Sequence, residues 1–172
     1  MTDAAPPAAS AGPAPAPVPR ERLAGLAGKR VLEMMLSGEL PRAPIAGAME
    51  FDLAEVGEGR TVFVGRPTAA FLNPLGTVHG GWIATLLDSA MGCAVHSALP
   101  PGRLYTTTSM TVNYVRALPG DGAPVRCEAS VVHAGGRSAT SEGKLWDAQG
   151  RLVAHGSETC LVFDAPSPPR AG

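Results

Sequence analysis

Residues Asn73–Ser97 read NPLGTVHGGWIATLLDSAMGCAVHS and carry a long apolar run in a chain of 172 residues. The first of these residues predict a turn, because Pro74 fixes one backbone dihedral and Gly76 permits a sharp one. From Gly80 onward, apolar residues recur at helical spacing, and the other faces of the same helix are mostly apolar too. A helix that is apolar nearly all round is typical of a buried helix. The sequence therefore predicts a central buried helix that begins near Gly80.

One acidic residue, Asp88, lies near the middle of this apolar helix, with Ala84 and Gly92 one helical turn away on either side. An ionised carboxylate that is buried without a partner is costly, and its burial raises its pKa. The residues alone leave two interpretations open. Asp88 is either a structural acid satisfied by backbone amides or an interface arginine, or the functional acid of a site.

The composition limits the class of protein. The formal net charge is -1 and the basic residues are scattered, which does not favour a nucleic-acid or membrane surface. The three cysteines are far apart and lack the spacing of a zinc or redox motif, so we expect buried thiols and no metal site. The N-terminus lacks a signal-peptide pattern, and the helix after Gly80 falls short of a membrane span. We therefore expect a cytoplasmic protein.

The chain divides into four segments by composition and pattern. In order, they are a disordered Ala/Pro-rich tail at 1–19, an N-terminal helix and linker at 20–44, a main domain at 45–163 and a frayed C-terminus at 164–172. The helix of the second segment is expected over residues 20–36, with Gly38 as its stop.

Strand patterns occupy most of the main domain. Two short strands are expected at 45–53 and 61–66, with a glycine turn between them. After the helix, a period of two predicts four strands with short links, at 105–116, 125–133, 138–146 and 152–163. Along the first of these four, one face is expected to hold Thr106, Thr108, Met110, Val112 and Tyr114.

Short links between consecutive strands imply an antiparallel meander. The sheet has one obvious apolar object to cover, the helix after Gly80, so the predicted fold class is α+β with the sheet curled round that helix. A single layer of this kind leaves sheet edges open, which favours a homodimer or a larger assembly.

The motifs of this chain closely resemble those of hotdog-fold acyl-CoA thioesterases, and most closely the phenylacetic-acid-degradation type. The matching residues are Asn73, His79-Gly80-Gly81, Asp88, the NYVR at 113–116, Gly136-Arg137 and the DAQGRLVAHG at 147–156. The likeness covers residues 45–163. It implies a hotdog fold, an antiparallel sheet wrapped round a long central helix, and hydrolysis of an acyl-CoA thioester to the free acid and coenzyme A.

The resemblance also implies a role for each matching residue. Asp88 matches the catalytic carboxylate, with its role as general base or as nucleophile left open, and the Gly80 N–H matches the oxyanion donor. Asn73 and His79 match the side chains near the thioester sulfur and the lytic water, and Thr107 resembles the hydroxyl that helps hold this water. The sites of the family lie at a dimer interface, so Asp88 would serve a thioester held by Gly80 of the other subunit. A helix N-terminus suits that role, since its N–H groups and dipole favour negative charge.

The phosphates of coenzyme A call for positive charge, and guanidinium groups suit phosphate geometry. Arg137 is favoured over Arg116, because Arg137 follows two glycines whose backbone amides can also approach phosphate. The predicted residues of this subsite are Gly81, Arg116, Gly136, Arg137 and Ser138. No cofactor is expected, because the coenzyme A thioester is the substrate. The expected partners are acyl-CoA and further copies of the chain, as a dimer or a dimer of dimers, without nucleic acid or membrane.

Two functions remain open from the sequence. One is an acyl-CoA thioesterase, and the other is a catalytically silent hotdog module that binds acyl-CoA. Asp88 favours the enzyme, since a pure binder gains nothing from an acid beside an acyl chain. A hotdog dehydratase needs an acid and a histidine on one loop-helix unit, and the spacing from Asp88 to His96 does not match. The acyl group stays open among aryl-acetyl, benzoyl-like, medium-chain and β-keto thioesters.

Overall fold

The computed structural model describes residues 18–19, 23 and 25–165, so most of the expected tail and residues 166–172 lie outside the described part. The helices are α2 (Gly28–Ser37), α3 (Pro44–Ala48), the 3-10 helix η1 (Ala69–Phe71) and α4 (Gly80–Ser97). The strands are β1 (Phe51–Gly57), β2 (Arg60–Gly65), β3 (Arg103–Tyr114), β4 (Val125–Ala134), β5 (Ser138–Trp146) and β6 (Leu152–Asp164).

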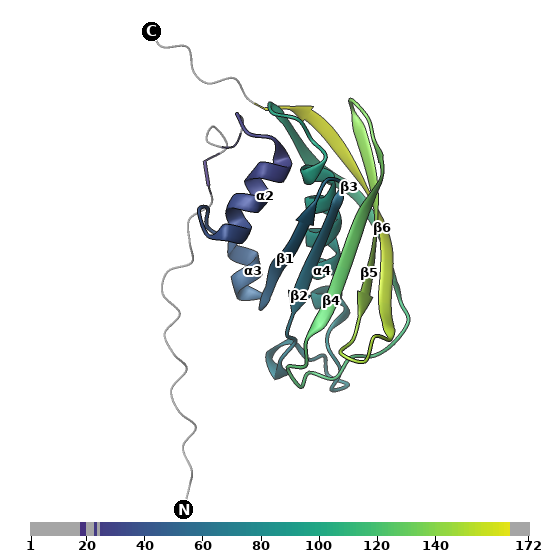
Figure 1. The fold of residues 1–172 in the computed structure, drawn as a ribbon. Helices are drawn as coiled ribbons and strands as arrows, with labels where there is room; N and C mark the ends of the chain where they lie inside the picture. The colour runs from purple at the N-terminus through teal and green to yellow at the C-terminus, as the bar shows by residue number, and fades with distance from the viewer. Residues whose placement is uncertain (1–17, 20–22, 24, 166–172) are drawn as a thin grey trace, which may run out of the picture.

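The six strands form one antiparallel sheet in the order β1-β2-β4-β5-β6-β3. Helix α4 carries the chain across the sheet from β2 to β3, so β3 lies beyond β6 at one edge, and β1 forms the other edge. Figure 1 shows this sheet curling round α4, with α2 and α3 beside the β1 edge. This arrangement confirms the predicted α+β class and the hotdog fold that the resemblance implied. The predicted meander holds for β4, β5 and β6 but was wrong for β3, which pairs with β6 and not with β4, because residues 115–124 cross over instead of forming a hairpin.

Helix α4 forms the centre of the hydrophobic core. Trp82 and Met91 are almost fully buried, and the Trp82 indole N–H donates to the Met49 carbonyl oxygen at 2.8 Å. The sheet lies close to the helix at Gly143, where an added Cβ would be 2.9 Å from Met91 Cγ. Among the described residues, no helix has the length and apolarity needed to cross a membrane.

The predicted helix at 20–36 is not continuous: residue 23 is helical, residues 20–22 and 24 lie outside the described part, and a break follows. Residues 25–27 are not helical, and α2 begins at Gly28, whose N–H donates to the Leu99 carbonyl oxygen at 3.0 Å. A Cβ at Gly28 would collide with the His96 carbonyl oxygen, so the helix begins where the chain packs against the end of α4. The predicted stop at Gly38 is confirmed, since Gly38 closes α2 with a φ of 83°.

The predicted strand at 45–53 was wrong in its first half. Pro44 stands in the first turn of α3, a position that suits its fixed φ, and the chain leaves this short helix through Glu50 at a φ of 54°. Strand β1 therefore begins at Phe51 and extends to Gly57. The glycine turn into β2 is confirmed, since Gly57 pairs with Arg60.

The predicted face of β3 was wrong at its start, because the strand contains an irregularity. The register against β6 shifts between Thr107 and Ser109, which pair with the consecutive residues Cys160 and Thr159. A β-bulge of this kind inserts one residue and reverses the alternation. Thr107 therefore faces α4, and so does Met110, which packs against the core.

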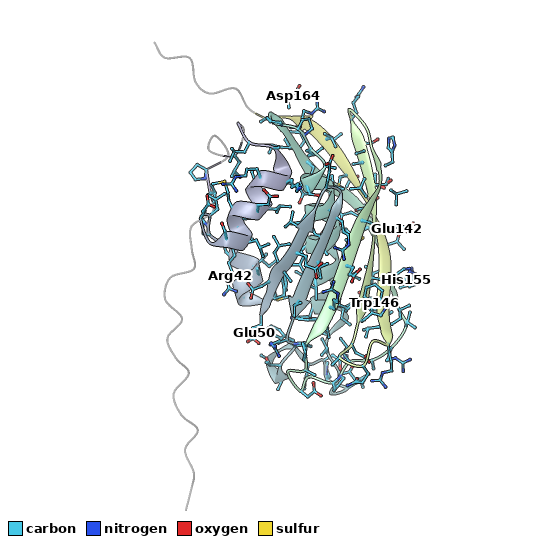
Figure 2. The ribbon with its side chains drawn as sticks, viewed as in Figure 1. Arg42, Glu50, Glu142, Trp146, His155 and Asp164 are labelled. Atoms are coloured by element: carbon cyan, nitrogen blue, oxygen red, sulfur yellow. The ribbon has the colours of Figure 1, made fainter. Side chains whose placement is uncertain are left out.

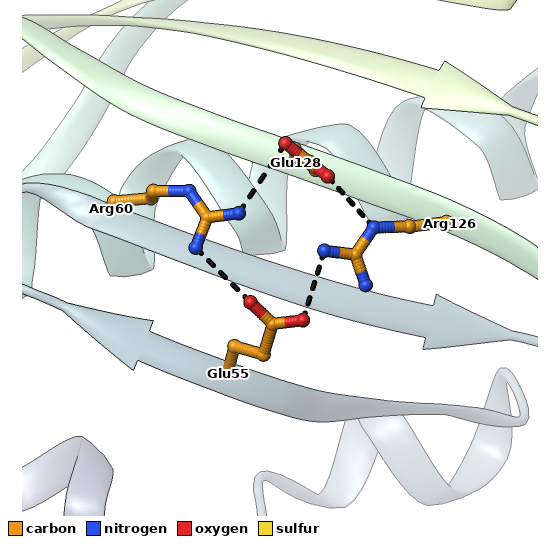
Figure 3. A network of polar contacts seen from close by, with 4 residues as sticks. All are labelled: Glu55, Arg60, Arg126 and Glu128. Carbon is orange, nitrogen blue, oxygen red and sulfur yellow. Dashed lines mark hydrogen bonds and ion pairs between the residues drawn. The ribbon is translucent and has the colours of Figure 1, made fainter.

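The outer face of the sheet is polar. Glu142 and His155 are exposed there, away from α4 (Figure 2). Over β1, β2 and β4, the four side chains of Glu55, Arg60, Arg126 and Glu128 form a closed ring of ion pairs with N–O distances of 2.7 to 3.5 Å (Figure 3). Hydrogen bonds from Arg126 and then Arg60 lower the pKa of Glu55. These exposed pairs support the strand register more than the overall stability.

Candidate active site

The loop before α4 is shaped by Asn73. Its side-chain oxygen accepts hydrogen bonds from the Leu75 N–H at 2.9 Å and the Thr77 N–H at 3.2 Å, and its amide nitrogen donates to Thr77 Oγ1 at 2.9 Å. Gly76 completes this turn with a φ of 79°. The Asn73 amide therefore closes the loop and fixes the approach to the helix.

The first turn of α4 is capped by His79. The His79 ring is exposed, and its Nδ1 accepts a hydrogen bond from the Gly81 N–H at 2.9 Å. The Gly80 N–H is the first N–H of the same turn, a position that has no carbonyl partner within a helix. The Tyr114 hydroxyl donates to the Gly80 carbonyl oxygen at 3.1 Å, and a Cβ at Gly80 would be 3.2 Å from the Tyr114 ring. The end of β3 thus lies against the start of α4.

Asp88 lies two turns further along α4 and is partly buried. Its Oδ1 is 3.3 Å from Thr107 Oγ1 on β3. Burial raises the pKa of Asp88, and the hydrogen bond with Thr107 opposes that shift only in part. Within the described residues, Asp88 takes part in no ion pair. The single chain therefore shows no basic partner that would make Asp88 a structural ion-pair residue.

A cavity of about 630 Å³ opens beside Asp88 and Thr107. Its wall comes from α2, the loop after it, α3, β1, β2, α4 and β3, and it is mainly apolar. Six of the apolar lining residues are Leu32, Met35, Leu36, Ile45, Phe51 and Phe63. The pair formed by Arg42 and Asp52, 2.6 Å apart, also lines it. A carboxyl group thus lies at the wall of an apolar space large enough for a small organic group.

The remaining predicted residues fall into two groups at opposite ends of β3. Arg116 lines a shallow hollow with Gly80 and Tyr114 beyond the C-terminal end of the strand. Arg137, between Gly136 and Ser138, lies in the β4–β5 hairpin at the other end, where Arg103 of β3 donates to the Gly136 carbonyl oxygen. One chain therefore brings Asp88 to Thr107 and Gly80 to Tyr114, but does not bring these two pairs to one place.

The comparison with known protein families identifies the family of this chain. The model of the thioesterase superfamily matches residues 75–154, which include all of α4 and strands β3, β4 and β5. The chain belongs to the thioesterase superfamily.

Individual solved structures are similar to this chain. The conserved protein PA5202 of Pseudomonas aeruginosa is 32% identical with a TM-score of 0.66, and the match covers 71% of this chain and 95% of that one. The phenylacetic acid degradation protein PaaI of Thermus thermophilus is 29% identical with a TM-score of 0.63, over 69% of this chain and 98% of that one. A hypothetical thioesterase of Streptococcus pneumoniae, solved with coenzyme A, shares the fold at 24% identity and a TM-score of 0.62, over 69% and 89% of the two chains.

A sequence relative matches over a shorter span. A protein of Halobacterium salinarum that carries the name of an esterase, VNG_1336C, is 42% identical over 69 residues. The match covers 39% of this chain and 44% of that protein, so the chain spans less than half the length of this curated relative.

Sequence reasoning missed one residue beside the candidate thioesterase site. Glu158 on β6 is only 1% exposed, and its Oε1 lies 2.9 Å from Thr107 Oγ1. The signal was present in the alternation of β6, where Ala154, Cys160 and Val162 are buried on the same face as Glu158. A period of two therefore predicts that this glutamate points inward.

Proposed function

We propose that the protein hydrolyses acyl-CoA thioesters to the free acid and coenzyme A, with Asp88 as general base or nucleophile. The observation that carries the proposal is the partly buried Asp88 carboxyl at the wall of an apolar cavity, without an ion-pair partner in the described residues. Burial raises the pKa of Asp88, which brings a carboxylate closer to the pH at which a base works best.

Either role of Asp88 gives a balanced reaction. As general base, Asp88 takes a proton from water while the hydroxide adds to the thioester carbonyl, and the proton passes to the departing thiolate when the C–S bond breaks. As nucleophile, its oxygen displaces the thiolate directly to give a mixed anhydride, which water then hydrolyses. Both routes develop negative charge on the carbonyl oxygen, and a backbone N–H at a helix start stabilises that charge.

The oxyanion donor comes from a second copy of the chain in this proposal. Gly80 and Asp88 are eight residues apart on α4, which separates them by about 12 Å along the helix at roughly 1.5 Å per residue. A base and an oxyanion donor acting on one carbonyl each lie about 3 Å from it. One chain is therefore too extended to supply both groups.

A homodimer through β3 supplies the geometry. Strand β3 is a long edge strand, and an antiparallel pairing of two copies about a two-fold axis near Thr111 sets the Thr107 end of one strand beside the Tyr114 end of the other. Because Thr107 contacts Asp88 and Tyr114 contacts Gly80, this pairing brings the base of one copy to the helix start of the other. The pairing also covers the open edge of the sheet.

Each part of the acyl-CoA substrate is assigned to the group whose chemistry suits it. The apolar cavity takes the acyl group, and its volume of about 630 Å³ suits an aryl-acyl or medium-chain group. Thr107 holds Asp88, or the water that it activates. His79 and Asn73 form the polar loop near the thioester sulfur. Arg137, with Gly136 and Ser138, or Arg116 with Gly81, meets the phosphates of coenzyme A.

The test is thiol release from a panel of acyl-CoA thioesters, followed with a disulfide reagent. Asp88→Asn should lower turnover about a hundredfold or more while coenzyme A binding persists, because the amide replaces a base at nearly constant volume. The matched control is Asp121→Asn, an exposed acid that closes its own turn by accepting from the Ala123 N–H. Near-normal turnover by the Asp88 variant would refute the assignment. Binding of acyl-CoA without hydrolysis by the wild type would support the silent module instead.

A further inference from the structure

A second carboxyl lies behind the candidate base, and the mechanism above does not use it. Glu158 Oε1 is 2.9 Å from Thr107 Oγ1 and 2.9 Å from Cys160 Sγ, while the same Thr107 oxygen is 3.3 Å from Asp88 Oδ1. The Glu158 side chain is 1% exposed, and its Oε2 has no hydrogen-bond partner among the described residues. One threonine hydroxyl thus stands between two carboxyl groups.

The hydrogen count at Thr107 decides how this cluster is arranged. A threonine hydroxyl has one proton to donate and two lone pairs that accept. If both carboxyls were ionised, the single proton would serve one of them and the other would face a lone pair. If one carboxyl is protonated, it donates to Thr107 Oγ1, and the Thr107 proton then goes to the remaining carboxylate. One proton on the pair is therefore the arrangement that satisfies both contacts of Thr107.

Burial decides which carboxyl keeps that proton. Glu158 is almost fully buried, whereas Asp88 is only partly buried beside the cavity, so the charge is better placed on Asp88. Burial raises the pKa of Glu158, its hydrogen bonds with Cys160 and Thr107 oppose that shift, and the charge of Asp88 raises the pKa further.

Among the residues that the structure describes, the other groups around Glu158 bring no positive charge. On strand β5, the buried cross-strand partner of Glu158 is Ser141, whose hydroxyl is uncharged. Three further groups interact electrostatically with Glu158: Tyr105 on β3, Cys93 on α4 and Cys160 on β6. They stay neutral at moderate pH, because burial raises the pKa of each thiol to about 12 and that of Tyr105 well above its ordinary value.

We propose that Glu158 is a positioning residue for Asp88: it remains a neutral carboxylic acid, donates to Thr107 Oγ1, and so turns the Thr107 proton toward the Asp88 carboxylate. Asp88 Oδ1 is then held in place, and its second oxygen is left for the water or the thioester. This inference rests on the proposed thioesterase function, because it assigns Glu158 a task in the same site. Ionisation of Glu158 at higher pH withdraws the Thr107 proton from Asp88.

The kinetic test compares two substitutions of Glu158 by their pH profiles of kcat/KM. Glu158→Ala removes the donor and should lower kcat/KM on the order of tenfold to a hundredfold, the worth of a hydrogen bond to a charged group. Glu158→Gln keeps a neutral donor of the same size, so it should recover most of that loss and abolish the alkaline fall of the wild-type profile while keeping the acid limb. Equal losses in both variants, or an alkaline limb unchanged in Glu158→Gln, would overturn the proposal.

An infrared measurement tests the same proton without any reaction. At neutral pH the wild type should show a C=O band of a protonated carboxyl that Glu158→Gln lacks, and Asp88→Asn should shift the titration of this band to lower pH because the neighbouring charge is gone. If Glu158→Gln does not fold, the wild type and Asp88→Asn suffice for this comparison. Absence of the band, or a titration unchanged in Asp88→Asn, overturns the role of Glu158 while thioester hydrolysis stands. A wild type that shows the band but hydrolyses no thioester contradicts the proposed function alone.

Discussion

A mixed dimer made from two inactive chains should be active if the site is shared between subunits. The first chain carries Asp88→Asn and loses the base. The second carries Gly80→Val, whose side chain blocks close approach to the first N–H of α4 and also presses on Tyr114, 3.2 Å from the position of the new Cβ. Because Gly80 and Asp88 are about 12 Å apart on one helix, neither chain can build a complete site alone.

The expected activity follows from counting sites. A dimer of one chain of each kind has one site with both defects and one with neither, so the isolated hybrid should reach about half of the wild-type rate per dimer. Random mixing makes about half of all dimers hybrid, so an unfractionated mixture should reach about a quarter. The assay is co-expression with two different tags, isolation of the hybrid and measurement of thiol release, with both parent homodimers as controls. A folded hybrid no more active than its parents would show that Asp88 and Gly80 serve the same subunit's site, and would refute the shared-site geometry.

Three further predictions concern stability and selectivity. Burial raises the pKa of Asp88, so the folded state binds the carboxyl proton more tightly than the unfolded chain, and the full cost of ionising Asp88 is present above the raised pKa. Asp88→Asn should therefore have a higher melting temperature than the wild type at neutral pH. This gain should vanish as the pH falls through the raised pKa toward the ordinary value of 3.8. A melting temperature that is lower for the variant at every pH would contradict this sign. Gly143→Ala should destabilise by about 1–3 kcal/mol in denaturant unfolding, because its Cβ would lie 2.9 Å from Met91 Cγ, whereas the control Gly57→Ala, with its nearest contact at 3.7 Å, should cost less. Met35→Trp narrows the cavity and should lower kcat/KM for aryl-acyl or medium-chain thioesters on the order of tenfold or more relative to acetyl-CoA; equal losses for all chain lengths would mean that the acyl group lies elsewhere.

The fold could be predicted from the sequence because its main elements are marked by local patterns. The all-round apolar helix, its start near Gly80 and the period-two runs after it each report burial through the spacing of neighbouring residues. The same spacing shows Asp88 as an exception, and motif resemblance then assigns it a role. The hydrophobic pattern alone did not predict the structure of the segment before β1. A short helix that begins at Pro44, followed by the positive φ of Glu50, replaces the first half of the expected strand.

The candidate site was predictable only in part. Asp88, Gly80 and His79 lie on one short stretch, so their order along the chain is enough to relate them. The cavity is different, since α2 and α3 reach it only by packing beside β1 and α4. The sequences of α2 and α3 show only ordinary amphipathic spacing, which does not reveal that these helices line a cavity.

The sequence by itself determined that an acidic residue would stand in a buried helix and that strands would cover that helix, because both follow from short periods of apolar residues. The tertiary structure alone decided that Thr107 meets Asp88 on one side and Glu158, 51 residues further along the chain, on the other. The reason is the bulge in β3: it exists only through pairing with β6, and it turns toward α4 a hydroxyl that regular alternation sends to the opposite face.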